Sequence, residues 1–475
     1  MTPRAVARRL GPALVTVAFL GAVIGGVGAP LITSVAVDLA VPLDAAQWTL
    51  TVTLFSGAIS APVLGRLGTG SHRRAALLTT LALVALGGLL TAIPSPFGIL
   101  VLGRALQGLG LGAVALLMSI ARDHLPEGQA QSAVATISVA GTVGIGVAYP
   151  LMGLVDQLAG LRIAYTVGFL LSLSAVLVAW WTIPHDEPRP TPRVDVPGAV
   201  LLGVATLGLL LAVAQPSVWH TPWVGVTILL VAALAFGVWA SWELRTPTPL
   251  VDLRLLVAGG VLRANVAMFV AGVGMYLLFS LLTRYVQTPA DVGASVATGD
   301  VGYGFGFSGV LAGAALIPFS VFGFVAGKLM RRWTARITAP SVFVVHAACV
   351  VVAAILFAVA PGSLVATLTA MAVLGFGVGG ASAIMPTLVL DGVPRQETSS
   401  VLSINQIVRT VGFSIGSAVA GLFLATATPD GELFPDEHGY PTAALCVLPL
   451  LVVAAVVIVA SCGAPRQPDS GGVRR

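Results

Sequence analysis

Two arginines interrupt long apolar stretches of this 475-residue chain, and each has polar neighbours at helical spacing. Arg104 precedes Gln107 by three positions and Arg409 follows Asn405 by four, so each pair would share one face of a helix. A charge deep in an apolar helix normally faces a cavity or a polar partner. Such groups bind or move polar and charged solutes. The alternative is that they hydrogen-bond backbone carbonyls and hold helices together.

Covalent and hydrolytic chemistry have no comparable support in the sequence. No cluster of His, Asp and Glu occurs inside the apolar stretches, so we do not expect an enzyme. No GxxxxGK[ST] phosphate loop is present, which argues against ATP hydrolysis. The three cysteines, Cys349, Cys446 and Cys462, lie in apolar runs without metal-ligand spacing. We therefore expect neither a bound metal nor a cofactor.

The composition predicts a membrane protein. Hydrophobic residues make up 57% of the chain and charged residues 9%, against about 25% charged residues in soluble domains. A helix needs about 20 apolar residues to span a bilayer, and these runs are continuous, unlike the alternating strands of a membrane β-barrel. The apolar runs predict fourteen spans: 11–31, 47–65, 75–93, 97–120, 131–154, 163–183, 198–214, 222–242, 264–286, 304–327, 339–359, 362–390, 400–426 and 441–462.

The basic residues indicate the orientation of these spans. With the N-terminal side taken as cytoplasmic, 20 of the 24 Lys and Arg residues fall on that side. Arg162 and Arg284 fall on the opposite side, and Arg104 and Arg409 lie inside spans. This asymmetry is typical of a multi-pass protein of the inner or plasma membrane with both termini in the cytoplasm. Because the basic residues form short clusters between spans, we expect a lipid bilayer, not nucleic acid, as the partner.

An internal repeat divides the chain. GLGAVALLMSIARDHLP (110–126) matches VGGASAIMPTLVLDGVP (378–394), and TVGIGVAYPLMG (142–153) matches TVGFSIGSAVAG (410–421), both at an offset of 268 residues. The repeat predicts an all-α integral membrane fold of two six-helix bundles and two extra central helices, related by an axis along the membrane normal. The expected units are an N-terminal bundle 1–183, a linker with the two extra helices 184–263, a C-terminal bundle 264–462 and a disordered cytoplasmic tail 463–475.

These motifs resemble the major facilitator superfamily and, within it, the fourteen-helix drug:proton antiporter branch. RALQGLGLG (104–112) is similar to the family's fourth-helix motif of Arg, then Gln-Gly, then small residues. GTVGIGVAYPLMG (141–153) resembles the glycine-proline motif of the antiporters, with Tyr149 where a glycine is usual. GRLGTGSHRR (65–74) resembles the cytoplasmic signature after the second helix, which it matches at Gly65, Leu67, Arg73 and Arg74.

The resemblance implies a major-facilitator-type fold and supports a part for Arg104 in substrate or proton handling. The depth of the Arg409 charge suggests the same part for that residue, and for both arginines the alternative is a structural role through backbone carbonyls. Gln107, Asn405 and Gln406 would line the cavity or form hydrogen bonds between helices. The fifth helix would contain a hinge and a closing surface, or only close helix contacts, at Gly141, Gly144, Gly146, Pro150 and Gly153.

Proton coupling requires a different carboxylate from the usual one. The antiporter branch carries an aspartate within its first helix, whereas here no Asp or Glu precedes Asp38. Asp38 follows the first predicted span at its outer end and is our first candidate for a relocated proton acceptor. A solvated loop charge is the alternative.

We expect a monomeric secondary transporter that exports small amphipathic organic molecules by alternating access, in exchange for protons. The first alternative is a facilitator or importer of a small anionic metabolite, which the two intramembrane arginines would suit. The second is a membrane receptor or scaffold that does not transport. The loop signature leaves room for it, because Thr69 and Gly70 stand where acidic and basic residues are expected.

Overall fold

The computed structural model is helical throughout the part of the chain that it describes. The described residues are 3–68, 72–184, 194–214, 218–219, 221–256, 259–289, 303–394, 397–428, 435–436 and 438–460. The predicted tail 463–475 lies outside these ranges. The helices are α1 (Pro3–Gly26), α2 (Gly28–Asp38), α3 (Leu43–Leu67), α4 (Arg73–Ala92), α5 (Phe97–His124), α6 (Glu127–Ala159), α7 (Leu161–Thr182), α8 (Val196–Ala214), α9 (Pro222–Arg245), α10 (Leu253–Leu256), α11 (Gly259–Tyr285), α12 (Gly309–Ala315), α13 (Ile317–Thr334), α14 (Ala339–Val359), α15 (Leu364–Val389), α16 (Thr398–Thr426), α17 (Gly439–Leu445) and α18 (Val447–Val459).

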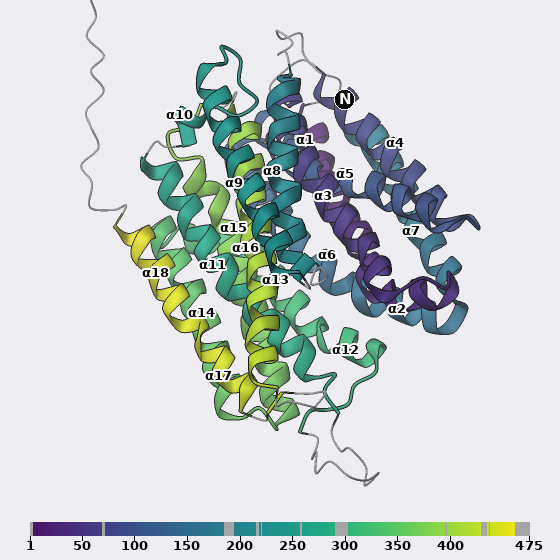
Figure 1. The fold of residues 1–475 in the computed structure, drawn as a ribbon. Coiled ribbons are helices and arrows are strands. Elements are labelled where there is room, and N and C mark those ends of the chain that lie inside the picture. The colour runs from purple at the N-terminus through teal and green to yellow at the C-terminus, as the bar shows by residue number, and fades with distance from the viewer. Residues whose placement is uncertain are drawn as a thin grey trace, which may run out of the picture.

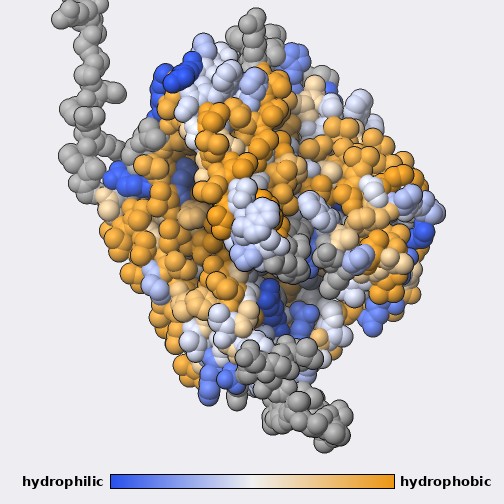
Figure 2. Space-filling view, in the orientation of Figure 1, coloured by the Kyte–Doolittle hydropathy of each residue, from blue (hydrophilic) through white to orange (hydrophobic). Residues whose placement is uncertain are grey.

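Thirteen stretches of the described chain are long and apolar enough to cross a membrane, and the bent helix α6 brings the number to fourteen. The predicted all-helical membrane fold is therefore confirmed. Hydrophobic residues cover much of the surface in Figure 2, and hydrophilic residues gather toward its upper and lower edges. This distribution suits a protein surrounded by lipid.

The first span is longer than predicted and is broken. It runs over Arg9–Asp38 as α1 and α2, with the break at Val27, where we had expected a single span over 11–31. Pro30 lies one turn after Gly26 and has no N–H to donate to its carbonyl, which weakens the helix at this point. Helix breaks of this kind are tolerated in membranes where neighbouring groups satisfy the released backbone atoms.

The helices form two bundles that repeat the same contacts. In the N-terminal bundle α5 packs against α3 and α4, and α1 packs against α6. In the C-terminal bundle α15 packs likewise against α13 and α14, and α11 packs against α16. The repeated segments of the sequence thus occupy equivalent places in the two bundles, which lie side by side in Figure 1.

Two long helices form the contact between the bundles. The helix α6 packs against α12, α13 and α15 of the other bundle, and α16 packs against α3 and α5. The extra helices α8 and α9 pack against each other, and α8 also contacts α3 and α16 (Figure 1). We call the end of the molecule where α1 begins and α3 ends the basic end, and the other end the opposite end.

Candidate functional site

Arg104 is completely buried inside the N-terminal bundle. Its Nη1 donates to the carbonyl of Ile24 (3.1 Å) and to Gln107 Oε1 (2.6 Å), and its Nη2 donates to the carbonyl of Gly25 (3.0 Å). Its Nε donates to the carbonyl of Thr49 in α3 (3.2 Å). The guanidinium therefore joins α5 to α1 and α3, and the expected shared face with Gln107 is a direct hydrogen bond.

The break in the first span explains why Arg104 finds these acceptors. Ile24 and Gly25 lie in the last turn of α1, directly before the break at Val27, where the regular backbone hydrogen bonding is interrupted. Gly28 makes room for the arginine, since a Cβ at this position would lie 2.7 Å from Arg104 Nη2. This geometry matches the structural hypothesis for Arg104, in which a buried arginine holds helices together through backbone carbonyls. A part for Arg104 in transport stays a prediction.

Arg409 has very different surroundings in α16. It is only half-buried, and its one hydrogen bond within the described chain runs from Nη1 to the carbonyl of Ser138 in α6, at 3.4 Å. Its guanidinium carbon lies 5.9 Å from the centre of the Phe413 ring. No ion pair joins it to an acidic residue in the ranges that the structure describes. Most of the five N–H groups of the Arg409 guanidinium therefore remain available to donate hydrogen bonds to a ligand or to water.

The position of Arg409 is close to the axis that relates the two bundles. At the offset of 268 residues its counterpart in the repeat is Gly141 of α6. A Cβ on Gly141 would lie 3.7 Å from Arg409 Nη2. Positions 141 and 409 are equivalent in the two repeats and contact each other, so both must lie beside the axis that relates the two bundles. Arg409 is therefore placed where a central path between the bundles would run.

Aromatic side chains extend from Arg409 into the C-terminal bundle. Phe413 stacks on Tyr276 of α11, with ring centres 4.9 Å apart and planes at 19°. Tyr276 also contacts Phe279 at 5.1 Å, and Phe279 contacts Phe319 of α13 at 5.0 Å. The sequence did not single out these rings, because they belong to no motif and come from three helices far apart in the chain.

The other polar residues of α16 have unequal roles. Asn405 is buried and donates to Asn265 Oδ1 of α11 at 3.0 Å, so it ties two helices of its own bundle together. Of the two alternatives left open for Asn405, interhelical hydrogen bonding is the one that this geometry matches. Gln406 is half-buried, and its backbone carbonyl accepts a hydrogen bond from Thr410 Oγ1 (2.9 Å).

The helix α6 bends by 43° between Glu127–Gly141 and Gly146–Ala159. Pro150, which lacks an N–H, follows the bend by one turn, so glycines and a proline account for it. Gly144 lies in the bend and packs inside its own bundle, where a Cβ would meet Ala22 of α1 at 2.5 Å.

The remaining small residues of α6 face the other bundle. A Cβ on Gly146 would overlap Ser320 Oγ of α13, and one on Gly313 of α12 would lie 2.8 Å from Pro150. A Cβ on Gly153 would lie 3.9 Å from Val310. Close contact between the bundles and a bend therefore coincide in the predicted glycine-proline motif.

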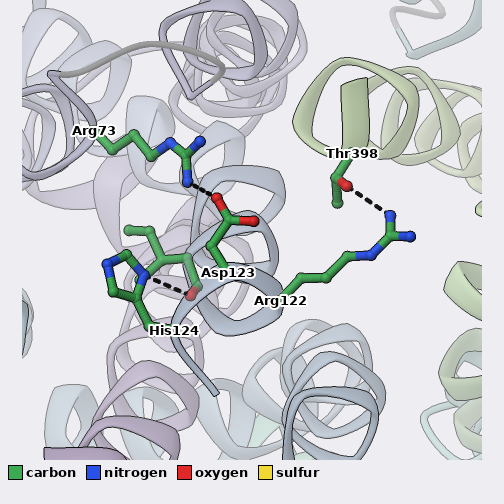
Figure 3. A network of polar contacts seen from close by, with 6 residues as sticks. Arg73, Arg122, Asp123, His124 and Thr398 are labelled. Carbon is green, nitrogen blue, oxygen red and sulfur yellow. Dashed lines mark hydrogen bonds and ion pairs between the residues drawn. The ribbon is translucent and has the colours of Figure 1, made fainter. Parts of the chain in front are cut away.

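A second contact between the bundles closes the basic end. A Cβ on Gly65 of α3 would lie 2.8 Å from Ser403 Oγ of α16. Arg122 at the end of α5 donates to Thr398 Oγ1 at 2.6 Å, as Figure 3 shows. Arg66 forms an ion pair with Glu397 at 3.8 Å. All these contacts join the N-terminal bundle to the start of α16.

The other residues of the predicted loop signature stay within the N-terminal bundle. Arg73 forms a buried ion pair with Asp123 (Figure 3). Arg74 donates to the carbonyl of Trp180 at 3.0 Å and lies over the Trp180 ring. Leu67 packs on the core of this bundle. The signature thus combines contacts within one bundle with contacts between the two.

Asp38 is exposed at the end of α2. Another carboxylate of the same region has a partner: Asp156 of α6 is half-buried and accepts a hydrogen bond from Ser34 Oγ of α2 at 2.5 Å. The structure therefore places Asp156, and not Asp38, between two helices.

An all-helical membrane protein with two repeated bundles and a polar group at their axis has the architecture of a secondary transporter. The model of the Major Facilitator Superfamily matches residues 14–417. The chain belongs to this superfamily, and it is therefore a membrane transporter of small molecules and not an enzyme.

Named relatives extend this assignment. The chain is 27% identical over 398 residues to the "Multidrug resistance protein B homolog" of Mycobacterium tuberculosis, a match covering 79% of this chain and 68% of the relative. It is 23% identical to the "Multidrug resistance protein Stp" of the same organism, over 86% of this chain and 73% of the relative. The structure of the human organic anion transporter MFSD10 (TETRAN) shares the fold with a TM-score of 0.62 and 16% identity, over 94% and 99% of the two chains.

Proposed function

We propose that the protein exports small amphipathic organic molecules in exchange for protons. The observation that carries this proposal is a half-buried arginine of α16 that reaches α6 of the other bundle, next to stacked aromatic rings of α16 and α11. Apolar surface with a few polar groups is what a site for amphipathic ligands needs. The names of the two mycobacterial relatives support export of drug-like molecules.

Alternating access would use the contacts that close the basic end. By the positive-inside rule the basic end faces the cytoplasm, so both termini lie there and the protein belongs in the inner or plasma membrane. The contacts of Gly65 with Ser403 and of Arg66 with Glu397 then close the cytoplasmic side. Opening that side requires α16 to separate from α3, while the bend in α6 adjusts its contact with α13.

Proton coupling needs a group whose proton occupancy differs between the two states. Asp38 remains our first candidate from the sequence, and Asp156 is added because its contact with Ser34 joins α2 to α6. Movement of α2 relative to α6 would break that hydrogen bond.

The test is transport by the purified full-length chain in liposomes, with an imposed proton gradient and with the gradient collapsed by an uncoupler. We expect gradient-driven movement of an amphipathic dye, and we expect Asp38→Asn or Asp156→Asn to weaken it while downhill exchange persists. Net flux that ignores the gradient would favour the facilitator alternative instead. Absence of transport for every substrate tried would favour the receptor or scaffold alternative.

A further inference from the structure

We propose that Arg409 and Phe413 of α16, with Tyr276 of α11, bind the charged group and the ring of the substrate, and that the substrate is an amphipathic aromatic anion. This inference rests on the proposed function and names its substrate class.

Arg409 lies in the middle of α16 and pairs with no acidic side chain among the residues that the structure describes. Neither α11, α13, α15 nor α16 contains an Asp or Glu, and the two acidic residues of α6, Glu127 and Asp156, lie near its ends. A charge inside a membrane protein normally has a partner or faces a water-filled cavity. An anionic substrate group would supply the missing partner, whereas a cationic substrate would meet repulsion.

The hydrogen-bonding capacity of Arg409 is open as well. Arg104 uses its donors on three backbone carbonyls and Gln107, so it has little left for a ligand. Among the described residues Arg409 makes one long hydrogen bond, to Ser138, and it is half-buried. Its planar guanidinium could therefore offer parallel N–H groups to a carboxylate or sulfonate, the geometry that arginine provides and lysine does not.

The rings beside Arg409 would hold the apolar part of the substrate. Phe413 and Tyr276 are both half-buried and stack on each other, so a substrate ring next to the guanidinium would extend this stack or pack against its edge. Aromatic rings favour offset-stacked or edge-to-face contact with one another. A planar ring with an attached anionic group can meet both parts of the site at once.

The site would also respond to the conformation of the protein. Arg409 reaches across to Ser138 and lies beside Gly141, so it touches both bundles. Rocking of the bundles changes these contacts. An anion that withdraws Arg409 from Ser138 would therefore bind the two states with different affinity, as a transported substrate must.

The test compares two dyes with the same xanthene ring system and opposite charge, the anion fluorescein and the cation rhodamine 123. Binding of each dye to the detergent-purified full-length chain is followed by fluorescence anisotropy. We expect fluorescein to bind at least about tenfold more tightly than rhodamine 123. Arg409→Gln should weaken fluorescein binding by about tenfold, a free-energy change of about 1.4 kcal/mol, and it should strengthen rhodamine 123 binding because it removes the repulsion. Phe413→Leu should weaken both dyes.

The matched control is Arg162→Gln, which removes one exposed arginine outside the site and should leave both affinities unchanged. Arg409→Lys keeps the charge without the planar fork and should give an intermediate affinity for fluorescein. Melting temperatures of all variants separate loss of binding from loss of folding.

The inference is overturned if the wild type binds fluorescein no better than rhodamine 123, or if Arg409→Gln and Arg409→Lys both bind fluorescein like the wild type. These outcomes are distinct from failure of the proposed function. A chain that exports rhodamine 123 in liposomes but does not bind fluorescein would keep the exporter and lose the anion site. A chain that binds fluorescein through Arg409 but moves no substrate would keep the site and lose the exporter.

Discussion

Arg104 and Arg409 both lie inside membrane spans, yet the two bundles surround them in opposite ways. Arg104 is buried among three helices of the N-terminal bundle, and four donations hold it in place. Arg409 is half-buried between the bundles and makes one long hydrogen bond. The difference teaches that the depth of a charge does not reveal its role. What matters is whether its donors are already satisfied by the protein.

The same contrast recurs at the basic end. The ion pair of Arg73 with Asp123 lies within the N-terminal bundle, with side chains 4% and 9% exposed. The pair of Arg66 with Glu397 joins the two bundles, and its side chains are 14% and 27% exposed. Pairs inside a bundle move as one body during rocking, whereas pairs between bundles must open. We therefore expect the first kind to affect stability and the second to affect conformational change.

The largest expected effect is the loss of stability in Arg104→Ala. The change removes the donor of the Gly25 carbonyl and of Gln107 Oε1, whereas the carbonyls of Ile24 and Thr49 keep donors from Val27 and Thr53. Each buried polar group left unpaired costs about 1–3 kcal/mol. We expect a loss of about 3 kcal/mol or more in the free energy of unfolding. The measurement is thermal denaturation of the purified protein, with Arg409→Ala as the control. Equal melting temperatures for the two variants would contradict the distinction between the arginines.

The second prediction reverses the charge at the other arginine. Arg409→Glu places a carboxylate beside Phe413 and Tyr276, so the site should now prefer rhodamine 123 to fluorescein by about tenfold, or about 1.4 kcal/mol. The measurement is fluorescence anisotropy with both dyes at equal ionic strength. A variant that keeps the wild-type order of affinities would show that the dyes bind elsewhere.

The fold was largely predictable because its signals are local or periodic. Continuous apolar runs indicated the spans, and the offset of 268 residues indicated which helices occupy equivalent places. The break at Val27 was missed, although Gly25, Gly26, Gly28 and Pro30 carry its signal in the sequence. Glycine and proline also occur often in regular membrane helices, so their presence alone does not predict a break.

The site was only partly predictable. Helical spacing correctly placed Gln107 beside Arg104, since residues three apart share a face. The same rule says nothing about contacts with other helices. Asn405 bonds to Asn265 of α11, and Tyr276 stacks on Phe413 of α16. Such pairs depend on how each helix is rotated within its bundle, which a single sequence does not specify.

A smaller effect is expected from the glycine next to each arginine. In Gly28→Ala the new methyl group would lie 2.7 Å from Arg104 Nη2 and displace the guanidinium, an overpacking that typically costs about 1–3 kcal/mol. In Gly141→Ala the methyl group would lie 3.7 Å from Arg409 Nη2, an ordinary contact. We expect the melting temperature to fall in Gly28→Ala and to stay the same or rise in Gly141→Ala. A comparable fall in both would mean that Arg409 is packed as tightly as Arg104.

The smallest effect concerns the ion pair between the bundles. Arg66→Gln removes a partly exposed charge pair, which is generally worth about 1 kcal/mol or less. The melting temperature should therefore change little, and less than in Arg73→Gln, whose pair with Asp123 is buried. If the Arg66–Glu397 pair helps to close the basic end, its loss should favour the open state by about 1 kcal/mol or less. This corresponds to an increase of up to about fivefold in the population of the open state.

That shift can be measured at Ser403, which is completely buried against Gly65 in the closed contact. A Ser403→Cys variant with Cys349, Cys446 and Cys462 replaced would react slowly with a membrane-impermeant maleimide applied to the basic end. Adding Arg66→Gln should raise the labelling rate of the Ser403→Cys variant by up to about fivefold, since 1 kcal/mol corresponds to that factor. Adding Arg73→Gln should instead lower the melting temperature and change the labelling rate less. The contrary outcome is a larger increase of the labelling rate in Arg73→Gln than in Arg66→Gln, compared at equal folded fraction. Ion pairs within a bundle would then affect opening of the basic end as much as pairs between bundles do. The contrast between Arg104 and Arg409 would in that case apply only to charges inside the membrane.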